Sequence, residues 1–158
     1  MEWLTAVEGS GFAIWVRESN SIWAYPTILT LHTVGLGLLV GANWALDLRL
    51  LGVGPNIPLA PLKRLFPAMW VGFWLNAITG VVLFTTEATT KGTTTIFFVK
   101  LGLVAVAVAA MKLTERSVYG RGLQVAAVTG TARALAAFSV VLWIAAIATG
   151  RFMAYVSV

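Results

Sequence analysis

Four long apolar segments, separated by short polar ones, dominate this sequence of 158 residues. The segments are Ile22–Leu46, Pro67–Thr86, Thr95–Met111 and Ala134–Tyr155. A helix needs about 20 mostly apolar residues to span the hydrocarbon core of a bilayer, and all four segments lie near or above that length. The first segment contains no Asp, Glu, Lys or Arg. We therefore predict an all-α integral membrane protein, a four-helix bundle forming one transmembrane domain over residues 1–158.

The composition excludes most classes of soluble protein. Hydrophobic residues make up 59% of the chain and charged residues 11%, whereas soluble domains carry roughly 25% charged residues. A water-soluble globule of this size has too much surface to cover with so few charges. The eleven Lys and Arg residues are scattered and form no basic stripe for nucleic acid. Because cysteine is absent, disulfides, thiolate zinc sites and cysteine nucleophiles are excluded as well.

The segments between the apolar runs carry their own signals. Residues 1–20 contain acidic residues and an internal Gly-Ser-Gly, unlike a signal peptide, and we expect short helices lying on the membrane surface. Their predicted apolar side consists of Trp3, Leu4, Val7, Phe12, Trp15 and Val16. We expect loops over Gly52–Pro61 and Thr85–Thr95, and a continuation of the third helix over Lys112–Ser117. Leu123–Thr131 is either a surface segment or an early start of the fourth helix.

The distribution of Lys and Arg near the segment ends predicts the orientation of the protein. Seven basic residues follow the first or the third segment, and four lie near the opposite ends. The seven are Arg49, Lys63, Arg64, Lys112, Arg116, Arg121 and Arg133, and the four are Arg17, Lys91, Lys100 and Arg151. We therefore predict a multi-pass protein of the bacterial inner membrane with both termini in the periplasm or exterior.

Small residues suitable for close helix packing occur in the first two segments. The first contains Gly35, Gly37 and Gly41, and the second contains Gly72 and Gly80. Lipid offers helices no hydrophobic reason to associate, so backbones approach one another at small residues. We expect these glycines to pack within the bundle. A homodimer through the GxxxG spacing of the first segment is the alternative.

Three polar residues share one face of the first segment. At about 100° per residue, His32, Asn43 and Asp47 fall close together, and they should point into the bundle because unpaired polar groups are costly in lipid. Asn76 of the second segment is an expected partner. Asp47 cannot pair well with Arg49 at a spacing of two residues. The expected cationic partners of Asp47 are Arg133, Arg116 and Lys112.

His32 is the only histidine in the chain and has two interpretations. As a structural residue, it is neutral and hydrogen-bonded to a neighbouring helix. As a functional residue, it is a haem ligand, a hydrogen-bond donor to a quinone or a proton carrier, because ionisable residues inside a membrane mark functional sites.

Lys100 and Arg151 are charged residues within apolar segments. Both side chains can reach the headgroup region by extending along their helices. Alternatively they form a small cationic site, with Glu87 balancing the charge and Trp143 packed beneath Arg151. Such a site could bind an anionic headgroup, a quinone carbonyl or a haem propionate.

Several kinds of chemistry lack the residues they need. One His and no Cys argue against a transition-metal site within the chain, and a haem held by two histidines would need one from another subunit. No phosphate-binding loop, Ser-His-Asp set or HExxH sequence is present. We therefore predict no catalytic residues, and the sequence favours a binding role over catalysis.

Several stretches resemble a bacterial four-helix inner-membrane family of unknown function. They are LHTVGLGLLVG over 31–41, DLRLLG over 47–52, AMWVGF over 68–73, FFVKL over 97–101, LW at 142–143 and GR at 150–151. The resemblance covers nearly the whole chain and marks His32, Asp47, Arg49, Lys100 and Arg151. It extends distantly to copper-resistance D-type proteins and b-type cytochrome bundles. Where family members carry Asn and His near the end of the third helix, this chain has Ala109, Ala110 and Met111.

The leading expectation is a membrane subunit or binding module that holds a quinone or similar lipophilic ligand for a redox or respiratory partner. The predicted ligand-binding residues are His32, Asn76, Lys100, Trp143 and Arg151, with Asn43, Asp47 and Arg49 as structural polar residues. The alternatives are a haem-b electron carrier with His32 as axial ligand, an ion or metal permease, and a purely structural partner protein. A homodimer or larger membrane complex is compatible with each.

Overall fold

The computed structural model describes residues 1–120 and 128–156, except for the side chains of Ala154 and Val156. Every regular element in these ranges is a helix. The four long helices are α3 (Tyr25–Leu51), α5 (Leu65–Thr85), α7 (Thr95–Tyr119) and α8 (Gly130–Val156). All four are long and apolar enough to cross a membrane. The predicted all-α four-helix architecture is confirmed, and the protein has the features of a multi-pass membrane protein.

The helix boundaries differ from those predicted by hydropathy. α3 begins three residues late and continues past Leu46 to Leu51, where Gly52 adopts a left-handed conformation with φ of 106° and ends the helix. α5 begins two residues early, so that Pro67 lies in its first turn. α8 begins at Gly130, so Thr131 belongs to the helix, while residues 123–127 and Arg121 lie outside the described part.

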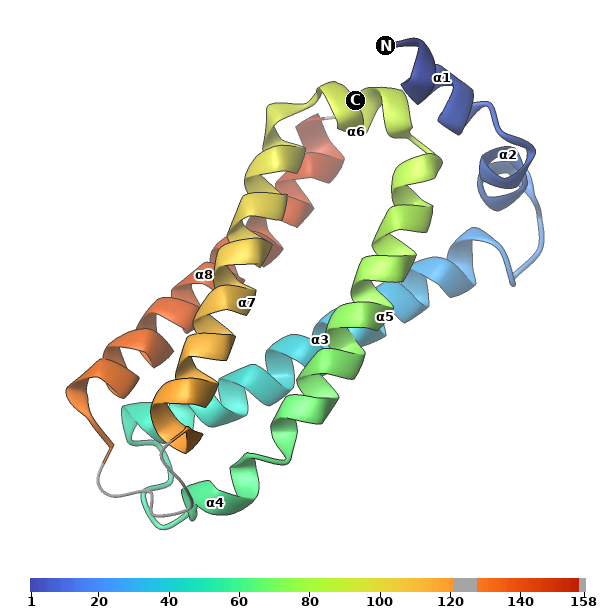
Figure 1. Ribbon diagram of the computed structural model, residues 1–158. Coiled ribbons are helices and arrows are strands. Elements are labelled where there is room, and N and C mark those ends of the chain that lie inside the picture. Colours follow the sequence, from blue (N-terminus) through green and yellow to red (C-terminus); the bar gives the residue numbers. More distant parts are fainter. Residues whose placement is uncertain (121–127, 157–158) are drawn as a thin grey trace.

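Both predicted loops between the spanning helices contain a short helix. α4 covers Leu59–Leu62, and α6 covers Ala88–Thr93. The two helices mark opposite ends of the bundle, which we call the α4 end and the α6 end. The N-terminus and the C-terminal end of α8 lie at the α6 end (Figure 1).

The four long helices form two hairpins that meet along one seam. α3 packs along α5, and α7 packs along α8. The hairpins join where α3 packs on α8, whereas α5 and α7 make little backbone contact. Ring contacts bring α5 and α7 together near their ends, with Phe84 stacked on Phe97 at one end and Phe66 edge-on to Tyr119 at the other.

The closest helix contact is the crossing of α3 and α5 at Gly35 and Gly72. A Cβ atom added to Gly72 would lie 2.6 Å from the backbone nitrogen of Leu39, and one added to Gly35 would lie 2.8 Å from that of Asn76. The two glycines therefore allow the backbones to touch. A Cβ atom added to Gly37 or Gly41 would meet no atom within 4 Å, and both glycines lie exposed on α3. Their expected packing within the bundle is wrong, and the homodimer stays a prediction.

A buried polar cluster joins α3 to α8. Asn43 donates from Nδ2 to Oδ2 of Asp47 and, over 2.8 Å, to Oγ of Ser139. All three residues are almost completely buried. The predicted ion pair of Asp47 with a basic residue is wrong, because no cation contacts it among the described residues. Lys112, Arg116 and Arg133 are instead exposed, and Arg49 donates to backbone carbonyls of residues 55 and 57.

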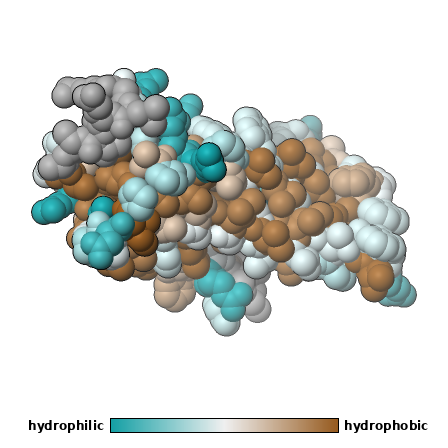
Figure 2. Space-filling model, turned by 90° about the horizontal axis from the view of Figure 1, so that it is seen from below, coloured by the Kyte–Doolittle hydropathy of each residue, from teal (hydrophilic) through white to brown (hydrophobic). Residues whose placement is uncertain are grey.

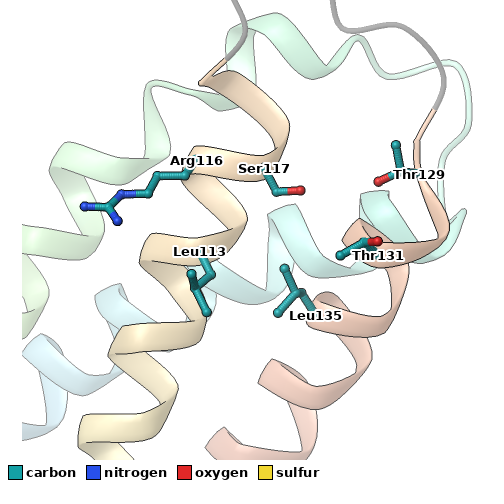
Figure 3. Close-up of a pocket in the computed structure, with 6 residues that line it drawn as sticks. All are labelled: Leu113, Arg116, Ser117, Thr129, Thr131 and Leu135. Carbon is teal, nitrogen blue, oxygen red and sulfur yellow. The ribbon is translucent and has the colours of Figure 1, made fainter.

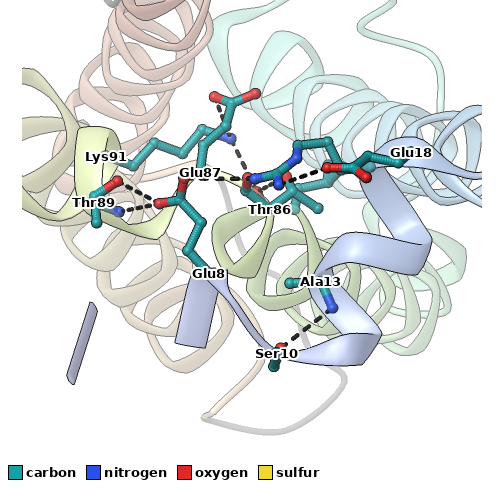
Figure 4. Close-up of polar contacts among 10 residues, drawn as sticks. Glu8, Ser10, Ala13, Glu18, Thr86, Glu87, Thr89 and Lys91 are labelled. Carbon is teal, nitrogen blue, oxygen red and sulfur yellow. Dashed lines mark hydrogen bonds and ion pairs between the residues drawn. The ribbon is translucent and has the colours of Figure 1, made fainter. Parts of the chain in front are cut away.

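The N-terminal helices α1 (Glu2–Glu8) and α2 (Gly11–Glu18) pack onto the α6 end rather than lying free. The carboxylate of Glu8 accepts hydrogen bonds from the backbone N–H and the hydroxyl of Thr89 (Figure 4). Arg17 donates to the carbonyl of Thr86 over 3.2 Å and lies 3.6 Å from Glu8. Leu4 and Val16, expected on the membrane-facing side, are buried in the protein, whereas Trp3, Phe12 and Trp15 are exposed.

The outer faces of the long helices carry many exposed apolar side chains. The view from the α4 end shows brown hydrophobic groups over much of the surface, with teal hydrophilic groups gathered nearer its margins (Figure 2). On α5, Val71, Trp74 and Ile78 are each about 60% exposed. Soluble monomers seldom expose apolar patches on this scale, so a lipid environment fits this surface.

Candidate functional site

The imidazole of His32 lies at the α3–α5 contact, seven residues or about 10 Å from the start of α3. Its Nδ1 is 3.0 Å from Oγ1 of Thr79. The single hydroxyl hydrogen of Thr79 points to the helix carbonyls of α5, with Oγ1 2.6 Å from the oxygen of Leu75. Thr79 must therefore accept from His32, which places the hydrogen of a neutral imidazole on Nδ1.

This arrangement leaves Nε2 of His32 as a lone-pair acceptor. No hydrogen-bond partner for Nε2 is found in residues 1–120 and 128–156. The ring packs against α5 where Gly80 provides space, since a Cβ there would lie 3.2 Å from Cε1. His32 is half-buried, so the acceptor is held in a fixed direction at the edge of the helix pair.

Lys100 lies at a similar depth on α7, five residues or about 8 Å from the helix start. Its stem crosses Gly150 of α8, where an added Cβ would lie 3.4 Å from Nζ. Lys100 is half-buried and within electrostatic range of His32. Across the described residues it makes no hydrogen bond and no ion pair.

Glu87 does not balance Lys100 as expected, because its carboxylate lies 3.3 Å from Nζ of Lys91. Lys91 also donates to the carbonyl of Leu83 over 3.0 Å. Together with Arg17 it satisfies carbonyls at the C-terminal end of α5, where positive charge interacts favourably with the helix dipole. Lys91 is thus paired with Glu87, and Lys100 is left without an acidic partner among the described residues.

The five predicted ligand-binding residues do not all lie together. Asn76 lies beside His32, but its amide donates to the backbone oxygen of His32 over 2.8 Å and thereby ties α5 to α3. Trp143 is completely buried in the core, seven residues from Gly150 and thus about 10 Å deeper. Arg151 is exposed. The structure therefore places His32 and Lys100 at a similar depth near the α6 end, a level that we call the His32–Lys100 layer, with Trp143 deeper in the core and the exposed Arg151 next to Gly150.

Two residues of this layer were not predicted as site residues, although Gly80 was expected to pack within the bundle. Thr79 holds the imidazole, and Gly80 gives the ring its space. Thr79 lies three residues after Asn76, on the same face of α5, and that spacing was the available signal.

The site combines one fixed acceptor with one cationic donor. The neutral Nε2 atom can accept a hydrogen bond or ligate a metal, and the ammonium of Lys100 can donate to a carbonyl or an oxyanion. Within the described ranges, no group of three or more His, Cys, Asp or Glu residues could hold a metal ion. The layer is thus suited to a ligand that presents oxygen atoms rather than to a bare cation.

Comparisons with protein-family models, with curated proteins and with solved structures find no match for this chain. The resemblance to a bacterial four-helix family and its distant cytochrome-like relatives therefore stays a prediction.

Proposed function

We propose that the protein is a membrane-embedded binding module that holds a lipophilic hydroxy-aromatic ligand, such as a quinol, for a redox or respiratory partner. The observation that carries this proposal is the presence, at a similar depth, of an unused Nε2 acceptor on His32 and an unpaired ammonium on Lys100. Both lie inside spanning helices at a similar depth. Uncompensated polar groups are costly in lipid, and a bound ligand would relieve that cost.

The chemistry of a quinol head matches the two groups. Its hydroxyl can donate to Nε2, and an oxygen of the same ring can accept from Nζ of Lys100. The unpaired ammonium of Lys100 favours an electron-rich ring oxygen over a cationic ligand. The isoprenoid tail would lie among the exposed apolar side chains of the bundle surface.

Binding of a short-chain ubiquinol to the protein in mild detergent tests the proposal. Loss of a hydrogen bond to a charged group costs about 1.5–3 kcal/mol, so we expect Lys100→Met to weaken binding by about tenfold or more. His32→Ala should weaken it as well. Lys63→Met, which removes an exposed lysine at the α4 end, is the matched control and should bind like the wild type. Unchanged binding by both site variants would refute the proposal and leave a structural role for His32.

A second candidate is a haem-b electron carrier with His32 as axial ligand. The orientation of the ring supports it, because metal-ligating histidines commonly donate their other N–H to a fixed acceptor, as His32 does to Thr79. Met69 and Met111 are buried about half of a helix length away, so neither could be the sixth ligand. A Soret band that shifts on reduction and disappears in His32→Ala would establish this function in place of quinol binding.

We also propose a bacterial inner-membrane location with the α6 end, and so both termini, facing the periplasm. Support comes from basic residues at the α4 end, such as Arg49 in the last turn of α3 and Lys63 and Arg64 just before α5. C-terminal fusions to alkaline phosphatase and to green fluorescent protein test this orientation. Phosphatase activity without fluorescence is expected, and the reverse result would invert the proposed topology.

A further inference from the structure

The helix pair α1–α2 presents aromatic side chains that the rest of the described chain leaves exposed. Trp3 of α1 is 63% exposed, and Phe12 and Trp15 of α2 are 54% and 46% exposed. The rings of Phe12 and Trp15 are stacked, with their centroids 6.5 Å apart. These side chains lie outside the spanning helices, and so apart from the His32–Lys100 layer.

The pair is held to the protein along one side of each helix. Leu4 of α1 packs on Gly92 of α6, where an added Cβ would lie 2.8 Å from Cδ2 of the leucine. Ala13 and Val16 of α2 are completely buried. That side of each helix is occupied by protein, which leaves the exposed aromatic residues as the apolar surface available to a partner.

The contacts of the pair place it at the level where the spanning helices end. Arg17 donates to the carbonyl of Thr86, the residue directly after α5. α2 ends at Glu18, and α3 begins at Tyr25. In Figure 1, α1 and α2 lie beyond α5 at the margin of the molecule, on the side away from α7 and α8. This position corresponds to the headgroup region of a bilayer that the four long helices span.

The chemistry of the exposed residues fits the boundary between headgroups and acyl chains. Trp is enriched there, because its ring is apolar while the indole N–H can reach headgroup oxygens. Exposed apolar residues continue along the chain through Ile22 and Trp23, which are 69% and 70% exposed, to Leu29 of α3. The aromatic surface of the pair thus continues the lipid-facing surface of the spanning helices.

The charge of residues 1–24 argues against attraction to anionic lipids as the source of binding. They contain three Glu and a single basic residue, Arg17, whereas surface helices that bind through charge are rich in Lys and Arg. The α4 end differs, since its exposed basic residues include Arg116, whose guanidinium extends away from Thr131 of α8 (Figure 3). Burial of aromatic surface is therefore the source of affinity that remains for α1 and α2.

We propose that α1 and α2 anchor the α6 end in the lipid leaflet, with Trp3, Phe12 and Trp15 inserted at the boundary between headgroups and acyl chains. Hydrogen bonds tie the pair to Thr86 and Thr89, so its insertion fixes the depth of the α6 end in the bilayer. The partner is the lipid surface itself, and the charge of its headgroups is not part of the recognition. This inference is independent of the ligand proposed for the His32–Lys100 layer.

Spin labels on single cysteines test the proposal, and the absence of native cysteine makes the labelling specific. The full chain is reconstituted in phosphatidylcholine vesicles. The collision rate of each label is then measured with oxygen, which concentrates in lipid, and with a water-soluble nickel chelate. Thr5→Cys and Glu18→Cys are the matched controls, because they replace exposed polar residues of the same two helices. The ratio of oxygen to chelate collisions should be severalfold higher for Trp3→Cys and Phe12→Cys than for these controls.

Three results would overturn the proposal. Equal ratios at all four positions would place the aromatic residues in water. Little collision with either reagent at positions 3 and 12 would show that protein, such as a second copy of the chain, covers them. Replacing part of the phosphatidylcholine by phosphatidylglycerol should leave the ratios unchanged, and insertion that occurs only with phosphatidylglycerol would show that lipid charge binds the pair.

Discussion

Replacing Gly72 by alanine should force α3 and α5 apart. The new Cβ would lie 2.6 Å from the backbone nitrogen of Leu39 and 2.8 Å from the backbone oxygen of Gly35. These are backbone atoms of a helix and cannot rotate away. Contacts between non-bonded atoms are favourable at about 3.5–4.0 Å, so the two helices must separate by about 1 Å at the crossing.

The energetic cost follows from what that separation disrupts. Overpacking of a close contact costs about 1–3 kcal/mol. The amide of Asn76 lies 2.8 Å from the backbone oxygen of His32, and a shift of about 1 Å would take it beyond hydrogen-bonding distance. Loss of that bond adds about 1 kcal/mol, and the better helix propensity of alanine returns about 1 kcal/mol. We therefore expect Gly72→Ala to lower the free energy of unfolding by about 2 kcal/mol.

Reversible unfolding in mixed micelles of a mild detergent and dodecyl sulfate, followed by circular dichroism, measures this change. Gly37→Ala is the matched control on the adjoining helix, since its Cβ would meet no atom within 4 Å. It should be neutral or slightly stabilising. Equal stability of the two variants would contradict the close backbone crossing from which the magnitude is derived.

Three further predictions use the same unfolding assay or a simple extension of it. Asp47→Ala should lower the free energy of unfolding by about 2–4 kcal/mol, because it leaves a cavity and removes a partner of Asn43. Asp47→Asn keeps a polar group there and should lower it less. Equal losses in the two variants would contradict the buried cluster. Tyr119→Phe removes the buried bond to the carbonyl of Leu59, 2.9 Å away, and should cost about 1 kcal/mol, a loss that an unchanged midpoint would exclude. Hydrogen bonds from Thr89 hold the pKa of Glu8 below its ordinary value of 4.5, so the stability that this contact adds to the docking of α1 is fully present above that pH and is lost as the pH falls below it. Hydrogen exchange in α6, corrected for the intrinsic exchange rate, should then rise in the wild type, but Glu8→Gln should show no such dependence.

The spanning helices could be predicted from the sequence because lipid demands long apolar segments, and that demand is visible residue by residue. The ends of these helices could be predicted less accurately. Asp47 marks a boundary in a hydropathy profile, yet it is buried within α3 because Asn43 and Ser139 supply its polar contacts. Such compensation depends on another helix, about 90 residues away in the sequence, and no local pattern reports it.

Local sequence also fails to show which glycines form helix contacts, as the contrast between Gly35 and Gly37 illustrates. Both lie in one Gly-rich stretch, and the GxxxG spacing favours Gly37 and Gly41. The structure uses Gly35 instead, because only that face of α3 meets Gly72. In the candidate site, His32 and Lys100 were recognisable as ionisable residues in apolar segments. Thr79 was not, since a threonine within a helix commonly bonds its own backbone and gives no sign of a second partner.

The division into two hairpins sets an order of assembly during synthesis. All contacts between α3 and α5 lie within the first 85 residues, so this hairpin can close while α7 and α8 are still being made. Because Asn43 and Asp47 lie on one helix, their hydrogen bond can form before α8 is made. The arrival of Ser139 then completes the cluster, and the α3–α8 seam becomes the last surface to close. A ribosome-stalled chain that ends before α8 should therefore contain a formed first hairpin. In it, Asn43 and Asp47 of α3 would lack the contact with Ser139.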